Sequence, residues 1–188
     1  MTRARIVMLG VLMAMAVAIA AEWSMGRLPL GPDGRFGWLE TNIWSSEQSQ
    51  RVIDPYSISH FVHGLLFYGL FWLVGRRWPV AYRFLAAVCL EAAWEILENS
   101  PLIINRYRAV TISLGYEGDS ILNSMSDIVM MAMGFVLASR LGVWTVVALV
   151  VVCELWMLVW VRDNLTLNVV MLLYPIEAIR QWQMAGAH

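Results

Sequence analysis

Long apolar runs, separated by short polar or charged segments, dominate the sequence. A helix that crosses a membrane needs roughly 20 mostly apolar residues, and five runs approach that length. They cover residues 6–22, 57–75, 79–98, 120–139 and 143–161. The pattern predicts an all-α fold, a polytopic membrane helix bundle with five transmembrane helices, in one membrane domain that covers residues 1–188.

A sixth and weaker run covers residues 165–182 and leaves two interpretations open. Its first half is apolar, but its second half carries Pro175, Glu177 and Arg180. The run either crosses the membrane as a sixth spanning helix or lies in the interface as an amphipathic C-terminal helix.

The first run and the polar loop after it, residues 23–56, bear on topology. Arg3 and Arg5 followed by an alanine-rich apolar stretch fit either a retained anchor or a cleaved secretory signal. We favour the anchor, because alanine-rich helix ends match cleavage sites easily. The arginines divide equally between the two sides of the membrane, so their number does not determine the orientation. The short loops beside the helix ends and the basic N-terminus favour a cytoplasmic N-terminus.

Composition narrows the class of protein and its partners. Charged residues make up 14% of the chain and hydrophobic residues 60%, whereas about 25% charged residues is usual in soluble domains. All 13 basic residues are arginine and the net charge is −1, which argues against nucleic acid as a partner. The lipid bilayer is the expected partner, and protein partners stay open. Cys89 and Cys153 fit neither a disulfide framework nor a zinc motif.

Ionisable residues recur at helical spacing in the second and third runs. His60 and His63 are three residues apart, and Glu91, Glu95 and Glu98 follow at steps of four and three. Such steps keep side chains on one side of a helix. Charged groups inside a bilayer are costly and by default indicate a functional site.

The fourth and fifth runs add polar residues at a similar depth. Asp119, Asn123 and Asp127 recur at every fourth residue, and Glu154 lies near the end of the fifth run. At a rise of 1.5 Å per residue, the intramembrane charges lie about 10 Å from the same face of an up-down bundle. The sequence therefore predicts a polar cavity open to one face of the membrane, which is the outer face if the N-terminus is cytoplasmic.

Two histidines with several carboxylates form a ligand set for zinc or another divalent metal, which can activate water for hydrolysis. The sequence has no His-Glu-x-x-His motif to strengthen this hypothesis. Arginine forks also suit phosphate or carboxylate groups of a lipid-linked or anionic ligand. The candidate metal ligands are His60, His63, Glu91 and Glu95, and the candidate catalytic residues are His63, Glu95 and Asp127. The candidate ligand-binding residues are His60, Glu91, Glu98, Arg106, Arg108, Asp119 and Asn123.

Other interpretations of these residues stay open. The histidines and carboxylates can relay protons in a small proton-coupled transporter. They can also be structural contacts between helices, with Asp127 paired to Arg106 or Arg108, in a non-catalytic assembly or accessory protein. A serine nucleophile is the weakest alternative, because nothing marks one serine as activated. Its candidates are Ser59, Ser120, Ser124 and Ser126.

Five stretches of the chain resemble an uncharacterised bacterial family of multi-pass inner-membrane proteins, known only as a domain of unknown function. They are SSEQSQ (45–50), SHFVHGLLFYGLFWL (59–73), EAAWEILENSP (91–101), NRYRAVTISLGYEGDSILNSMSD (105–127) and RDNLTLNVVMLLYPIEAIRQWQ (162–183). The family has a short Cys-x-Cys stretch after the first helix, where this chain has PLGPDG (29–34). The resemblance therefore implies a location in the bacterial inner membrane, and it implies no metal or redox role for that loop.

A looser likeness connects the chain to VanZ-like membrane proteins. It consists of a histidine-containing helix, then the Glu-x-x-Trp-Glu sequence at 91–95, then a helix that carries aspartate. This likeness is one of pattern and implies no particular activity.

Overall fold

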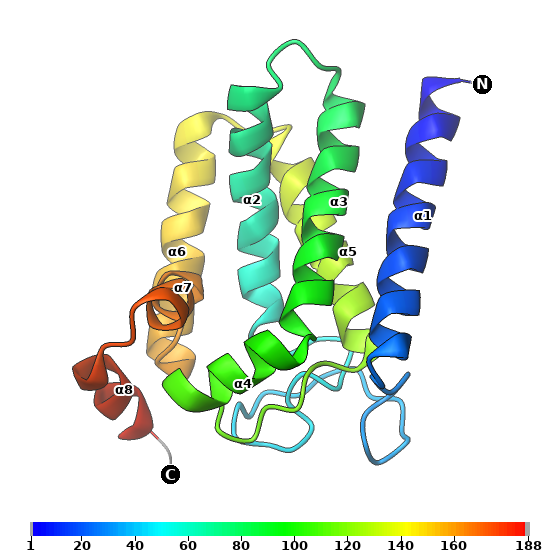
Figure 1. Cartoon of the computed structure of the whole chain (residues 1–188). Helices are drawn as coiled ribbons and strands as arrows, with labels where there is room; N and C mark the ends of the chain where they lie inside the picture. The colour runs from blue at the N-terminus through cyan, green and yellow to red at the C-terminus, as the bar shows by residue number, and fades with distance from the viewer. Residues whose placement is uncertain (1, 187–188) are drawn as a thin grey trace.

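The computed structural model describes residues 2–186, and it folds them into helices joined by turns and loops (Figure 1). The helices are α1 (Arg3–Ser24), α2 (Ser57–Val74), α3 (Val80–Glu98), α4 (Pro101–Val110), α5 (Ile121–Ala138), α6 (Val143–Val161), α7 (Leu165–Leu173) and α8 (Glu177–Met184). The extended structure among the described residues is one isolated bridge between Leu39 and Ile53. The prediction of an all-α bundle is confirmed.

Four helices are long and apolar enough to cross a membrane: α1, α2, α5 and α6. The prediction of five such helices is therefore corrected. Helix α3 runs alongside the others (Figure 1) and has 19 residues, but it carries Arg83 and three glutamates. Its glutamates at positions 91 and 95 are fully buried inside the protein, because α3 packs between α1, α2 and α5. Apolar composition is required only of a helix that faces lipid.

The C-terminal run does not form one helix. Helices α7 and α8 have 9 and 8 residues, and the break between them contains Pro175. Each is about 13 Å long, which is less than half of the hydrocarbon thickness. The alternative of a sixth spanning helix over 165–182 is therefore wrong. Glu154, expected among the polar residues of the cavity, instead accepts hydrogen bonds from the backbone N–H groups of Leu165 and Thr166 at the start of α7.

Helix α4 is an element that the apolar pattern missed. Pro101, which follows the third apolar run, begins α4 and occupies its first turn. Proline fits there because the first N–H groups of a helix have no partner inside the helix. Arg106 and Arg108, expected in a loop, therefore lie on a short helix at the loop end of the bundle (Figure 1).

Helices α2 and α5 form the closest helix pair, and two glycines make this contact. A Cβ atom added at Gly64 would lie 1.9 Å from the carbonyl oxygen of Met131, and one added at Gly134 would lie 2.1 Å from that of Phe61. Small residues at such crossings let two backbones approach. The contact holds the histidines of α2 beside the polar residues of α5.

Apolar side chains cover the outer surface of the helices. Val159 on α6 is 84% exposed, and Met13 on α1 is 65% exposed. Away from the loop end, the interior of the bundle holds an apolar core formed by Ala18, Ala87, Val88, Ala92, Ile128, Met131 and Phe135, and Arg83 near the start of α3 is buried as well. An apolar exterior over an apolar interior is the pattern of a protein that is solvated by lipid. The chain is a helical membrane protein.

Candidate functional site

A cavity of about 1070 Å³ lies at the end of the bundle where the loop before α2, helix α4 and the segment before α5 gather. Side chains from α2, α3, α4, α5 and α7 contribute to its wall, together with both loops. Its ionisable lining residues are Arg27, Asp54, Tyr56, His60, His63, Glu98, Tyr107, Arg108, Tyr116, Glu117, Asp119 and Asp127. The structure therefore has a cavity at one end of the bundle, and ionisable side chains form part of its mostly apolar wall.

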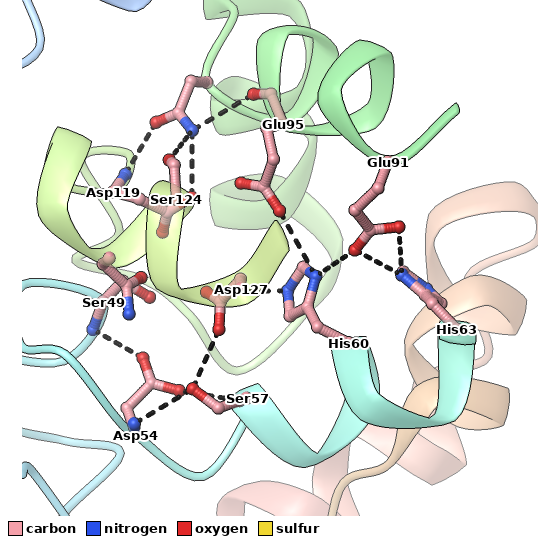
Figure 2. A network of polar contacts seen from close by, with 12 residues as sticks. Ser49, Asp54, Ser57, His60, His63, Glu91, Glu95, Asp119, Ser124 and Asp127 are labelled. Carbon is pink, nitrogen blue, oxygen red and sulfur yellow. Dashed lines mark hydrogen bonds and ion pairs between the residues drawn. The ribbon is translucent and has the colours of Figure 1, made fainter. Parts of the chain in front are cut away.

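The two histidines of α2 converge on one carboxylate of α3 (Figure 2). The His60 Nδ1 atom lies 2.6 Å from Glu91 Oε1, and the His63 Nδ1 atom lies 3.0 Å from the same oxygen. Glu91 is fully buried, and the ring of Phe67 stacks on His63 with centroids 5.5 Å apart. The helical spacing of three residues turns both imidazoles toward α3, as the sequence pattern predicts.

Glu95, one turn further along α3, is buried without a hydrogen-bond donor. Its side chain is 0% exposed, and neither carboxylate oxygen has a hydrogen-bond partner within residues 2–186. The basic side chain nearest to it among the described residues is His60, whose Nδ1 atom lies 3.3 Å from Glu95 Oε1. An isolated buried carboxylate costs several kcal/mol, so this group requires a proton or a cation.

Asp127 of α5 lies on the opposite side of the His60 ring (Figure 2). Its Oδ2 atom is 3.8 Å from His60 Nε2, and its Oδ1 atom accepts a 2.8 Å hydrogen bond from the Ser57 hydroxyl. Asp54 fixes Ser57 in turn, because its carboxylate accepts a hydrogen bond from the Ser57 backbone N–H at 3.1 Å. Burial and the charge of Asp119 raise the pKa of Asp54 to about 6.

Asp119 stands just before α5 at the other end of the cluster. Asn99 donates to its Oδ2 atom at 3.0 Å, and the Tyr116 hydroxyl donates to its Oδ1 atom at 3.0 Å. Burial raises the pKa of Asp119 to about 6 against the effect of these donors. Ligand atoms of Asp119, Glu95 and Glu98 lie within 4.8 Å of one another, so the carboxylates of α3 and Asp119 form a continuous group.

Three predicted residues have other roles. Arg106 donates from Nε to the backbone oxygen of Leu172 and is not part of the cavity wall. Asn123 donates to the backbone oxygen of Arg51, which ties the loop to α5. Arg108 does line the cavity, but its Nε donates to the Tyr116 backbone oxygen. The predicted pairing of Asp127 with either arginine of α4 is therefore wrong, because both guanidinium groups bind main-chain oxygens.

Comparison with known proteins shows to which family the chain belongs. Residues 22–185 match the model of a family described as protein of unknown function, DUF2585. The chain belongs to the DUF2585 family. The resemblance to an uncharacterised family is thus confirmed, and its match is wider than the stretch from 45 to 183 on which the sequence motifs lie.

Relatives from several bacteria match this DUF2585 protein over most of their length. The UPF0314 protein of Paracoccus denitrificans is 50% identical over 173 residues, which is 91% of this chain and 90% of the relative. UPF0314 protein R03235 of Rhizobium meliloti is 49% identical over 181 residues, with 96% and 92% covered. The UPF0314 protein of Sphingopyxis alaskensis is 49% identical over 166 residues, with 86% of each covered. No solved structure matches the chain.

Several residues of the cluster escaped the sequence analysis. Ser57 and Asn99 lie at helix ends, where polar residues usually serve as caps and raise no suspicion. Asp54 is followed three residues later by Ser57 at the start of an apolar run, which is a helix-start signal that could have placed it beside α2. Glu22 is fully buried, and both its carboxylate oxygens lack a partner among the described residues. Its position near the end of an apolar run suggested only an interfacial residue.

In this DUF2585 protein, the balance of charges limits which ligands the cluster of histidines and carboxylates can bind. Among the described residues, no arginine forms an ion pair with any carboxylate of the cluster. Three overlapping groups have ligand atoms close enough to hold a metal ion, and the histidines are the only basic groups in them. The groups are His60, His63 and Glu91; His60, Glu95 and Asp127; and Glu95, Glu98 and Asp119. Such an acidic excess binds either protons or a divalent cation.

Proposed function

We propose that this protein is a membrane-embedded hydrolase that depends on a divalent cation and acts on an anionic amphiphile. One observation carries the proposal: the half-buried His63 and the buried His60, Glu91 and Glu95 converge without arginine partners beside a cavity of about 1070 Å³. In the proposed site the cation is held by His60, His63, Glu91 and Glu95. Zinc and manganese are the metals that this mixture of nitrogen and oxygen ligands suits best.

The spacing of the ligand atoms supports cation binding. Atoms that share a tetrahedral zinc ion at about 2.0–2.2 Å lie about 3.4 Å apart. The Nδ1 atom of His60 is 3.3 Å from Glu95 Oε1, and that of His63 is 3.1 Å from Glu91 Oε2. The shorter 2.6 Å contact between His60 Nδ1 and Glu91 Oε1 would have to lengthen, and Glu95, which lies within reach of His60, would have to turn toward the ion held by the other three residues.

The position of Asp127 supports the same assignment. A metal-bound histidine usually donates its other ring N–H to a carboxylate, which fixes the tautomer and the ring orientation. If His60 binds the cation through Nδ1, its Nε2 side faces Asp127 at 3.8 Å, and Asp127 is held by the Ser57 hydroxyl. Asp127 is thus proposed as the residue that orients His60.

The two ends of the cavity support an amphiphilic substrate. Phe67, Leu90, Trp94 and Val169 form apolar wall next to the histidines, whereas Arg27 and Arg108 lie on the wall formed by the loops and α4. An acyl or prenyl chain fits the first region, and a phosphate or carboxylate group fits the arginines. With the N-terminus in the cytoplasm of a bacterial inner membrane, the cavity opens to the outer side.

The proposed reaction uses the cation to lower the pKa of a bound water molecule. The oxygen of that water bonds to the electrophilic phosphorus or carbonyl carbon, and the bond to the leaving group breaks. The proton passes to a cluster carboxylate on the cavity wall, where Glu98 and Asp127 both lie, and from there to the oxygen of the leaving group. A proton-coupled transporter is less well supported, because the interior beyond the cluster is an apolar core.

The test combines metal content with turnover. Detergent-purified protein is stripped with a chelator, reloaded with zinc or manganese, and analysed by plasma mass spectrometry beside His63→Ala and Glu95→Gln. Release of phosphate from dodecyl phosphate is then measured with and without the metal. We expect bound metal in the wild type, its loss in both variants, and turnover only of the loaded wild type.

The matched control is Glu177→Gln, which makes the same chemical change on the exposed face of α8. It should bind metal like the wild type. Absence of metal from reloaded wild type would overturn the proposal and leave a proton-titrating or structural cluster. Bound metal with no turnover of dodecyl phosphate or of a dodecanoyl ester would overturn the hydrolase assignment and leave only a metal site.

A further inference from the structure

A second group of carboxylates adjoins the proposed metal ligands and shares one residue with them. Glu95, Glu98 and Asp119 have ligand oxygens that all lie within 4.8 Å of one another. Glu95 also belongs to the group with His60 and Asp127. The same carboxylate is therefore close to His60 and Asp127 and also to two further carboxylates.

From this arrangement we infer that the cluster binds two divalent cations, with the Glu95 carboxylate as the bridge between them. The first cation lies among His60, His63 and Glu91, and the second lies between Glu98 and Asp119. This inference rests on the proposed function, and it makes the site a pair of metals acting together.

Glu95 itself is the independent observation that points to a cation on each side. Both its oxygens are buried and without a hydrogen-bond donor among residues 2–186, although the side chain is 0% exposed. A carboxylate that bridges two ions uses one oxygen for each of them, which gives both orphaned atoms a partner. A single ion at the histidines would leave one oxygen unsatisfied.

The surroundings of the second position suit a hard cation. Its ligands are all oxygen atoms, which magnesium, calcium and manganese prefer. Asn99 and Tyr116 already donate hydrogen bonds to Asp119 and fix its orientation, as the outer partners of metal-binding carboxylates do. Glu98 and Asp119 both line the cavity, so water can complete the coordination of the second ion.

A pair of metals bridged by a carboxylate has a clear chemical use. Two ions about 3.5–4 Å apart can bind the attacking and the leaving oxygen of one phosphate or acyl group. The first ion then holds the nucleophilic water, and the second neutralises the leaving group beside Arg108, which lines the same cavity. Two ions also neutralise four of the negative charges that no arginine balances.

Manganese stoichiometry tests this inference. Chelator-stripped protein is loaded with manganese, freed of excess metal by gel filtration, and analysed by plasma mass spectrometry and electron paramagnetic resonance. We expect two ions per chain in the wild type with a spin-coupled spectrum. Glu98→Gln and Asp119→Asn should each retain one ion and lose the spin coupling. Glu117→Gln, which changes an exposed carboxylate on the same cavity wall, should retain two.

The outcomes separate this inference from the proposed function. One uncoupled ion in the wild type, retained in Glu98→Gln, would overturn the second position and leave the first intact. No ion in the wild type would overturn both. Two coupled ions that persist in Glu98→Gln and Asp119→Asn would overturn the assignment of these ligands. Glu98→Gln guards against a folding defect in Asp119→Asn, because Glu98 lies outside the hydrogen bonds between Asn99 and Asp119.

Discussion

Single side chains in this protein are held by partners from distant parts of the sequence. His60 lies between Glu91 of α3 and Asp127 of α5, and Ser57 secures Asp127. Helical spacing was sufficient to predict that His60, His63 and Glu91 face the interior, because the spacing rule is local. The roles of Ser57 and Asn99 could not be predicted, because they depend on which helices become neighbours.

The role of Ser57 can be measured through metal affinity. Replacing Ser57 with alanine removes the hydroxyl that donates to Asp127 at 2.8 Å, so the carboxylate that faces His60 loses its support. Loss of such an outer partner typically costs about 10- to 100-fold in metal affinity. We expect Ser57→Ala to weaken zinc binding by about tenfold in a competition assay with a chelating dye. Ser57→Thr, which keeps the hydroxyl, should bind nearly normally, and equal affinities for all three proteins would contradict the role.

Asp163, between α6 and α7, gives a prediction on pH that is separate from the cluster. Its carboxylate accepts hydrogen bonds from the Tyr56 hydroxyl and the Gln183 side chain, but burial raises its pKa to about 6. The native state therefore binds more protons than the unfolded state between pH 3.8 and about 6, so stability falls as the pH rises through this window. Above about pH 6, the stability contributed by the protonated Asp163 is lost completely.

The melting temperature in detergent should accordingly decline between about pH 4 and pH 6.5. Asp163→Asn should decline less steeply, since the amide does not titrate, while Asp54 and Asp119 supply the remaining slope in the same direction. Parallel pH profiles for the wild type and Asp163→Asn would show that Asp163 does not titrate in this range.

At the scale of helices, apolar runs located α1, α2, α3, α5 and α6 to within a few residues, because length and hydropathy alone set such elements. The same rule failed for α4, whose sequence PLIINRYRAV is too polar and too short to register as an apolar run. It also merged α7 with α8, although Pro175 and the charges beyond it marked the break. The close approach of α2 and α5 through Gly64 was not predicted, because it depends on which helices become neighbours.

The two glycines of α2 provide a matched pair of substitutions. Gly64→Ala places a methyl group against the Met131 carbonyl, whereas Gly69→Ala meets nothing within 4 Å. Overpacking against backbone costs about 1–3 kcal/mol, which corresponds to a fall of about 2–12 °C in melting temperature at this chain length. We expect that fall for Gly64→Ala, and no loss or a small gain for Gly69→Ala, because alanine favours helix. Equal melting temperatures would contradict the close contact.

At the scale of the whole molecule, the short helices α7 and α8 determine on which side of the membrane the C-terminal segment lies. The start of α1 lies at one end of the bundle, whereas α8, the long loop and the cavity lie at the other (Figure 1). This follows because α7 and α8 are each too short to cross, so the chain remains on the side where α6 ends. The sequence alone left that side open between two alternatives.

Reporter fusions can establish this arrangement. A reporter that is active only outside the cytoplasm should give a signal when fused after residue 186, and a cytoplasmic reporter should be active when fused before residue 2. The same extracytoplasmic reporter inserted between α2 and α3, near Arg76, should be silent. Activity of a single reporter at both termini would mean that the C-terminal segment crosses the membrane after all.

The most direct test of the central claim is to locate the metal. Crystals of zinc-loaded protein, measured on both sides of the zinc absorption edge, should give an anomalous difference peak within bonding distance of His60, His63 and Glu91. The side chain of Glu95 should complete that coordination. Ordered side chains at the cluster with no peak between them, or peaks only at surface carboxylates, would contradict the assignment of a metal-dependent site.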